Sequence, residues 1–148
     1  MYTTFNGQRT TVQDFLGSHL NGSRVLYIGT DSRNTTQTKF STVMVSHHPG
    51  RGGVLLKRVH AERKIDSLAE RLLREAWYSV ELALQVTPML PAHMKIEIHL
   101  DVNQSALHKS GRYLQSVVGL VMAQGFDYRV KPDAWCATCI ADKVVKAF

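Results

Sequence analysis

The sequence has little cysteine and little proline: two cysteines, Cys136 and Cys139, and four prolines among 148 residues. The C-x-x-C pair alone supplies too few ligands for a four-ligand zinc site. A thioredoxin-like motif would open a helix directly after a strand, whereas this pair falls inside an expected helix. We therefore expect two small buried residues on a packed helix. A thiol-redox or zinc protein is the weaker alternative, and it predicts loss of function on Cys→Ser substitution.

Long hydrophobic runs are also missing. No apolar segment approaches the roughly 20 residues that span a bilayer, and residues 1–11 lack the apolar centre of a signal peptide. Hydrophobic residues make up 44% and charged residues 20%, which is ordinary for a soluble globular protein. We expect a cytoplasmic protein with no membrane partner. The length fits one domain over residues 1–148, with residues 1–23 as a short N-terminal appendage.

Acidic residues are in the minority. Eighteen Lys and Arg residues stand against twelve Asp and Glu residues, giving a formal net charge of +6. A basic surface favours polyanionic partners such as nucleic acid. The plain alternative is a soluble basic protein with no such partner, so the charge alone does not identify a function.

The spacing of apolar residues predicts the element order β-β-β-α-β-α-β-α after an N-terminal helix over 11–20. The expected strands cover residues 24–31, 39–47, 54–59, 95–101 and 126–131, with a Pro/Gly turn over 48–53. The expected helices cover residues 61–87, 111–124 and 133–146, the last with Asp133 as its N-cap. Short links make the first three strands antiparallel, and the later β-α-β units require parallel strands. The fold class is therefore α/β, with a mixed five-stranded sheet and helices on both faces.

Two aspartates stand at the ends of expected strands. Asp31 ends an apolar strand, where a carboxylate needs a partner, and a metal ion is one. The alternative is an Asx-turn over residues 31–34. Asp101 closes the fourth strand, at the carboxyl end where open α/β sheets bind ligands. Glu97 and His99 share its polar face and are minor candidates for contacts.

Two further acids lie on expected helices. Glu75 projects about 60° from Leu72 around its helix and so borders the apolar stripe. The alternative is a surface ion pair with Arg71, four residues earlier. Asp142 lies on an apolar stripe in a final helical turn, where negative charge opposes the helix dipole; the alternative is a frayed helix end. Carboxylates are the ligands that Mg²⁺ and Mn²⁺ prefer, and two such ions about 4 Å apart promote phosphodiester hydrolysis.

Five segments carry a family resemblance: YIGTDS (27–32), RLLREAWYS (71–79), EIHLDVN (97–103), HKSGRYLQSVVGLV (108–121), and VKPDAW (130–135) followed by ADK (141–143). With these segments the sequence resembles the YkuK family of ribonuclease H-like proteins, over nearly the whole chain from Tyr27 onward. The resemblance implies a ribonuclease H-like fold and, through the wider superfamily, two-metal hydrolysis of nucleic acid. It implies that the metal ligands and catalytic acids are Asp31, Glu75, Asp101 and Asp142. No catalytic histidine is visible in the link over 131–133, which leaves a resolvase-like nuclease open.

The leading hypothesis is a nuclease that uses Mg²⁺ or Mn²⁺ and acts on RNA, an RNA–DNA hybrid or branched DNA. The alternative is a non-catalytic module that binds nucleic acid or a protein and retains a vestigial metal site. Basic side chains expected to contact phosphates are Lys64, Arg71, His108, Lys109, Arg112 and Lys143. A solvated basic surface is the alternative for these residues. The sequence does not indicate an oligomeric state.

Overall fold

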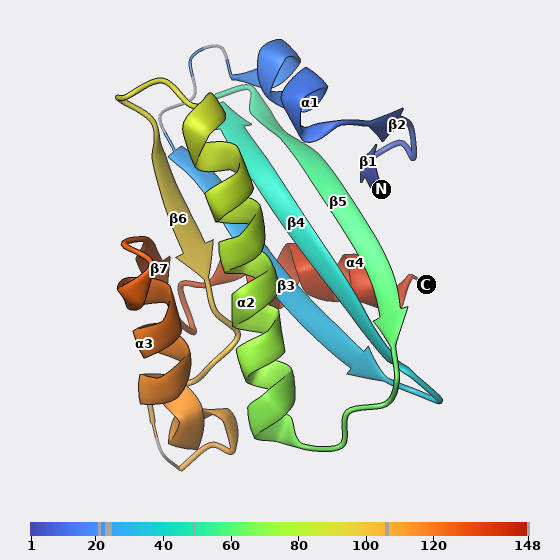
Figure 1. Ribbon diagram of the computed structural model, residues 1–148, viewed down its shortest axis with the longest axis vertical. Coiled ribbons are helices and arrows are strands. Elements are labelled where there is room, and N and C mark those ends of the chain that lie inside the picture. The colour runs from blue at the N-terminus through green and yellow to red at the C-terminus, as the bar shows by residue number, and fades with distance from the viewer. Residues whose placement is uncertain (21, 23–24, 49, 106, 148) are drawn as a thin grey trace.

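The computed structural model describes residues 1–20, 22, 25–48, 50–105 and 107–147. Its strands form one mixed sheet in the order β2-β1-β5-β4-β3-β6-β7 (Figure 1). The strands are β1 Tyr2–Thr4, β2 Arg9–Thr10, β3 Val25–Asn34, β4 Thr38–His48, β5 Gly52–Glu62, β6 Lys95–His99 and β7 Asp127–Arg129. The helices are α1 Val12–His19, α2 Leu68–Val86, α3 Leu114–Ala123 and α4 Asp142–Lys146. Short helical turns are η1 Thr87–Met89 and η2 Ser110–Tyr113, and η3 Cys136–Ala141 is π-helical.

The layers follow from the connections. The long strands β3, β4 and β5 form an antiparallel meander, and β6 then pairs parallel to β3 and β7 parallel to β6. Helices α2 and α3 cover one face of the sheet, and η3 with α4 covers the other (Figure 1). The expected mixed sheet with helices on both faces is confirmed. None of the helices in the described part of the chain has both the length and the apolar character needed to cross a membrane.

The expected count of five strands is wrong, because the sheet has seven strands among the described residues. The two additional strands, β1 and β2, come from the N-terminal appendage. Strand β1 pairs with β5 through Thr3↔Lys57 and Thr4↔Leu56. Strands of two or three residues are too short to show an alternating pattern, so the sequence does not predict them. Strand β1 covers part of the outer edge of β5, which would otherwise expose unpaired backbone groups there.

Several boundaries differ from those predicted. Strand β3 continues past Asp31 to Asn34, because these residues still pair with β4. Strand β5 runs to Glu62, so the expected helix over 61–87 begins late, after Ser67, whose hydroxyl accepts from the Glu70 N–H. Arg24, the expected start of the first strand, and Pro49, in the expected turn, lie outside the described residues.

The main core lies between the sheet and α2. The helix turns Leu72, Ala76 and Val80 toward Leu26 and Ile28 of β3, and all five are buried. Each large apolar side chain buried in this way contributes about 1.5–3 kcal/mol. The same helical period brings Glu75 and Ser79 onto the sheet-facing side.

The C-terminal helical segment packs unusually close to β3. Asp133 is not its N-cap, because Asp133 lies in a turn and the helix begins two residues later, at Trp135. A Cβ placed on Gly29 would lie 2.5 Å from the Ala137 backbone nitrogen. Only glycine therefore allows η3 to rest directly on the strand, and this close contact fixes the position of α4 beside β3.

Candidate metal centre

Asp31 lies within β3 rather than at its end. It is opposite Ser41 of β4 and two residues beyond Gly29, where the parallel pairing with β6 stops. Its side chain is 7% exposed. Residues 31–34 remain in the strand, so the alternative of an Asx-turn is wrong. Gly29 and Asp31 alternate onto the same face, and both meet the C-terminal helical segment there.

Glu75 reaches the sheet from α2 and is 7% exposed. The Ser32 hydroxyl donates a hydrogen bond of 2.5 Å to Glu75 Oε1. Thr30, Glu75 and Asp101 line one small cavity beyond the end of β6. The alternative of a surface ion pair between Glu75 and Arg71 is wrong because Glu75 is buried. The Arg71 Nε is itself buried, with no hydrogen-bond partner among the described residues.

Asp101 follows β6 by two residues, in a segment that stays beside the chain leaving β7. The Leu100 N–H donates to the Arg129 carbonyl over 2.8 Å, and the Lys131 N–H donates to the Val102 carbonyl over 3.0 Å. These bonds bring the Lys131 Nζ to 2.7 Å from Asp101 Oδ1. That oxygen is buried and accepts no well-aligned hydrogen bond from the described residues.

Asp142 begins α4, which continues directly from η3. It therefore does not lie in a final turn, and the predicted conflict with the helix dipole is wrong. The last turn instead carries Lys143 and Lys146, which suit a helix C-terminus. The Lys146 Nζ lies 2.8 Å from Asp142 Oδ2. Asp142 also lies close enough to Asp31 to raise the pKa of that carboxyl group.

The four acids form one electrostatic cluster. Burial, together with the negative charges of Asp101 and Asp142, raises the pKa of Asp31 to about 8. Burial likewise raises the pKa of Glu75 well above its usual range, and the charges of Asp31 and Asp101 add to this. The Ser32 hydrogen bond and the Arg71 charge oppose the rise only in part. At neutral pH the cluster therefore holds protons unless a cation replaces them.

The donor set fits a hard divalent cation. The four carboxylates, among them Asp31 and Glu75 with raised pKa values, supply the oxygen ligands and the negative charge that Mg²⁺ or Mn²⁺ requires. One of these oxygens, Asp101 Oδ1, is buried without a well-aligned donor. Across the described ranges, however, no three Asp, Glu, His or Cys side chains already converge on one point. Instead, Lys131 forms an ion pair with Asp101, and Lys146 forms one with Asp142. Binding of a cation therefore requires these lysines and carboxylates to rearrange.

The six residues expected to contact phosphates lie in four places. His108 and Lys109 lie exposed in the loop after Asp101, and Arg112 lies exposed in η2. Lys143 is exposed on α4, next to Asp142. Lys64 is 3.8 Å from Asp66 ahead of α2. Arg71 is half-buried on α2, beside Glu75.

Two lysines at the cluster were not singled out from the sequence. Lys146 is four residues after Asp142 on a helix, a spacing that predicts an ion pair, so this contact was available to sequence reasoning. Lys131 contacts Asp101 only because the segments that follow β6 and β7 run beside each other and share backbone hydrogen bonds. No local pattern indicates that contact.

Two hydrogen bonds hold the His99 ring between elements of the fold. Its Nδ1 accepts from the Cys136 N–H over 3.0 Å, and its Nε2 donates to Glu97 over 2.8 Å. Burial lowers its pKa, which favours the neutral ring, and the two bonds join β6 to the last helical segment. Cys136 is buried as expected, and burial raises the pKa of its thiol. Cys139 is exposed, contrary to expectation, and both cysteines are free.

Comparisons with known proteins agree with this architecture. A family model described as ribonuclease H-like matches residues 8–146. The chain is 30% identical over 159 residues to "Uncharacterized protein YkuK" of Bacillus subtilis (strain 168), with 97% of this chain and 91% of the relative covered. No solved structure gives a significant match.

Proposed function

The chain belongs to the YkuK family of ribonuclease H-like proteins, and from this premise we propose that it is a divalent-metal-dependent nuclease. The family itself indicates a nucleic-acid-related function. The proposed reaction is hydrolysis of phosphodiester bonds in RNA, an RNA–DNA hybrid or branched DNA. The observation that carries the proposal is the cluster of Asp31, Glu75, Asp101 and Asp142, whose members are close enough to raise the pKa of the two most buried acids.

In this proposal each of the four carboxylates has a role in binding Mg²⁺ or Mn²⁺. Ions bound there would supply an activated water and stabilise the leaving oxygen. Asp31 and Asp101 would hold the ions from β3 and from the end of β6. Glu75, oriented by Ser32, would bind metal and orient the attacking water, and Asp142 would complete the second site. We assign this activity to a single domain over residues 1–148, with residues 1–23 as its appendage.

The basic side chains would bring the nucleic acid to the cluster. His108, Lys109 and Arg112 follow Asp101 in the chain, and Lys143 follows Asp142 directly. Replacing a phosphate-binding lysine or arginine should weaken binding of all nucleic-acid sequences alike. It should also reduce the slope of log binding constant against log salt concentration by about 1. Arg112→Ala is the cleanest test, since Arg112 is exposed and lies outside the acid cluster.

One observation favours a second candidate, a nucleic-acid- or protein-binding module with a vestigial metal site. Lys131 and Lys146 already neutralise two of the acids, and no three of the described acid, histidine or cysteine side chains converge on one ion position. This candidate predicts salt-sensitive binding with no cleavage under any divalent ion.

A labelled substrate panel separates the two candidates. Single-stranded RNA, an RNA–DNA hybrid, duplex DNA and a four-way junction are each incubated with Mg²⁺ or Mn²⁺. The nuclease proposal expects cleavage of at least one substrate by the wild type and by Asp14→Asn, a control at an exposed acid in α1. It expects no cleavage by Asp31→Asn. Binding without cleavage of any substrate would support the vestigial site instead.

A further inference from the structure

Strand β7 ends the sheet and leaves one edge open in the described structure. The Arg129 carbonyl faces β6, where it accepts from the Leu100 N–H. Because backbone groups alternate sides along a strand, the N–H and C=O of Tyr128 point away from β6 toward the open side. An open edge of this kind is a template for a further strand.

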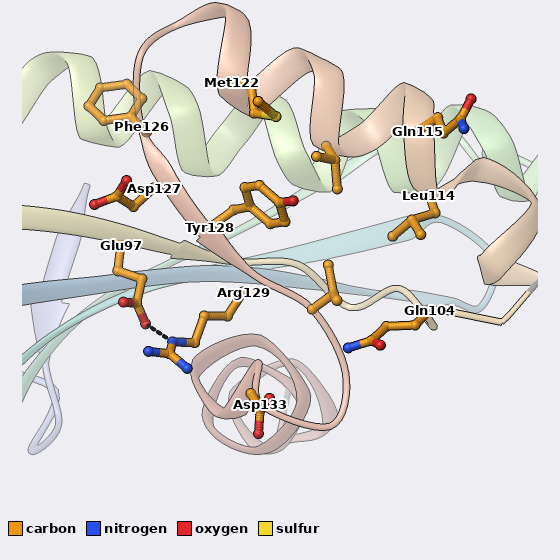
Figure 2. Close-up of a pocket in the computed structure, with 12 residues that line it drawn as sticks. Glu97, Gln104, Leu114, Gln115, Met122, Phe126, Asp127, Tyr128, Arg129 and Asp133 are labelled. Atoms are coloured by element: carbon orange, nitrogen blue, oxygen red, sulfur yellow. Dashed lines mark hydrogen bonds and ion pairs between the residues drawn. The ribbon is translucent and has the colours of Figure 1, made fainter.

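The surface beside this edge is partly apolar. Helix α3 and β7 line a hollow of about 1020 Å³, and Tyr128 and Met122 both point into it (Figure 2). Their side chains are 40% and 59% exposed. Glu97, Asp127 and Arg129 lie on the opposite face, because they alternate with Ile98 and Tyr128 in the paired strands.

The charged residues around the open edge of β7 indicate which kind of partner can bind there. The hollow extends around the β7 edge to this opposite face, where the described charged residues that line it are Glu97, Asp127, Asp133 and Arg129. Three acids thus face one arginine here, although the chain as a whole is basic. This acidic excess disfavours nucleic acid as the occupant. The order Asp-Tyr-Arg along β7 is complementary to itself when two copies run antiparallel. A parallel copy in register would place like charges opposite each other.

We propose that β7 pairs antiparallel with β7 of a second copy of this chain, about a two-fold axis that passes beside Tyr128. Asp127 then faces the partner's Arg129, and Arg129 faces the partner's Asp127. The two Tyr128 residues exchange their outward N–H and C=O groups as a hydrogen-bonded pair. Their rings lie on the α3 side, where the contact also covers Met122.

Arg129 has the donors for this contact. Its Nε already donates to Glu97 Oε1 over 2.9 Å (Figure 2), and the side chain is 54% exposed. The two terminal nitrogens remain to form a two-pronged ion pair with the partner's Asp127. Three paired residues form a small contact, so we expect a reversible dimer with a Kd on the order of micromolar.

Sedimentation analysis of the full chain over a range of concentrations tests the proposal with complementary charge variants. Asp127→Arg and Arg129→Asp each place like charges opposite each other, and each should be monomeric. An equimolar mixture of the two should form a dimer, because both facing pairs then become Arg–Asp. Asp14→Asn should behave as the wild type.

Circular dichroism of each variant distinguishes lost pairing from lost folding. Tyr128→Pro gives a second test, because it deletes the outward N–H and keeps the charges; its dimer should be at least about tenfold weaker. A wild type that remains monomeric at about 1 mM would overturn the proposal. Folded single-charge variants that dimerise like the wild type, or a mixture that stays monomeric, would also overturn it.

Discussion

Asp142 of α4 raises the pKa of Asp31 of β3, both through its negative charge and through hydrogen bonding between the two carboxyl groups. Two carboxyl groups can share such a bond only when one of them holds a proton. Protons and divalent cations compete for the same oxygens in this cluster.

Metal binding should release protons. Burial, Asp101 and Asp142 together raise the pKa of Asp31 to about 8, so Asp31 must lose its proton before it binds a cation at pH 7. The raised pKa of Glu75 acts in the same direction. Calorimetric titration with Mn²⁺ in buffers of different ionisation enthalpy should show this release. Affinity should rise from pH 6.5 to pH 8. An affinity independent of pH would contradict the prediction.

The metal-free fold should lose stability as the pH rises from 6.5 to 8. In this window the unfolded chain has ionised Asp31, whereas the folded chain still holds its proton, so the folded state binds more protons. Each such carboxyl lowers the free energy of unfolding by up to about 1.4 kcal/mol per pH unit. The lowered pKa of His99 acts in the opposite direction only below about pH 6.5.

Urea denaturation in the presence of a chelator measures this slope. Asp31→Asn should flatten it, because the amide does not titrate, and Asp14→Asn should leave it unchanged. A wild type whose stability increases across the same window would contradict the assigned direction.

Removing the lysines from the cluster should strengthen metal binding. Lys131 and Lys146 occupy Asp101 and Asp142, so Lys131→Met and Lys146→Met each free a carboxylate and remove a positive charge. We expect affinity for Mn²⁺ to rise by up to about tenfold, which corresponds to 1.4 kcal/mol. Lys109→Met, at an exposed loop position, is the matched control. If both variants bind Mn²⁺ no better than this control, the lysines do not compete with the ion.

Gly29→Ala should displace the C-terminal helical segment. The new Cβ would lie 2.5 Å from the backbone nitrogen of Ala137, and backbone cannot yield as a flexible side chain does. Overpacking of this kind costs about 1–3 kcal/mol, and displacement of α4 would remove Asp142 from Asp31. Gly119→Ala on α3 meets no atom within 4 Å and should stabilise the helix by about 1 kcal/mol. Equal thermal stability of the two variants would contradict the role of Gly29.

The sequence predicts the parts of this molecule that depend on local patterns. Alternation and helical period place β3 and α2, and they place Asp31 and Glu75 where burial raises their pKa values. Strands β1 and β2 are too short to carry such a pattern. The contact of Lys131 with Asp101 depends on tertiary pairing beyond the ends of β6 and β7, so local spacing does not indicate it.

The helical prediction over 133–146 shows a further limit. Its apolar spacing correctly indicates a packed helix, but the π-helical stretch Cys136–Ala141 arises where η3 rests on Gly29. The sequence-based position of Asp142 in a final turn is wrong because Asp142 begins α4, whose last turn carries Lys143 and Lys146. Its proposed role beside Asp31 does not depend on that turn.

The most direct test measures cleavage and binding of one substrate by the wild type and Asp31→Asn, both with Mn²⁺. The substrate is the one from the panel that the wild type binds most tightly. We expect the wild type to cleave it, and Asp31→Asn to retain most of the binding while cleavage falls to the metal-free background. Full cleavage by Asp31→Asn would contradict the carboxylate mechanism, and binding without cleavage by the wild type would contradict the nuclease function.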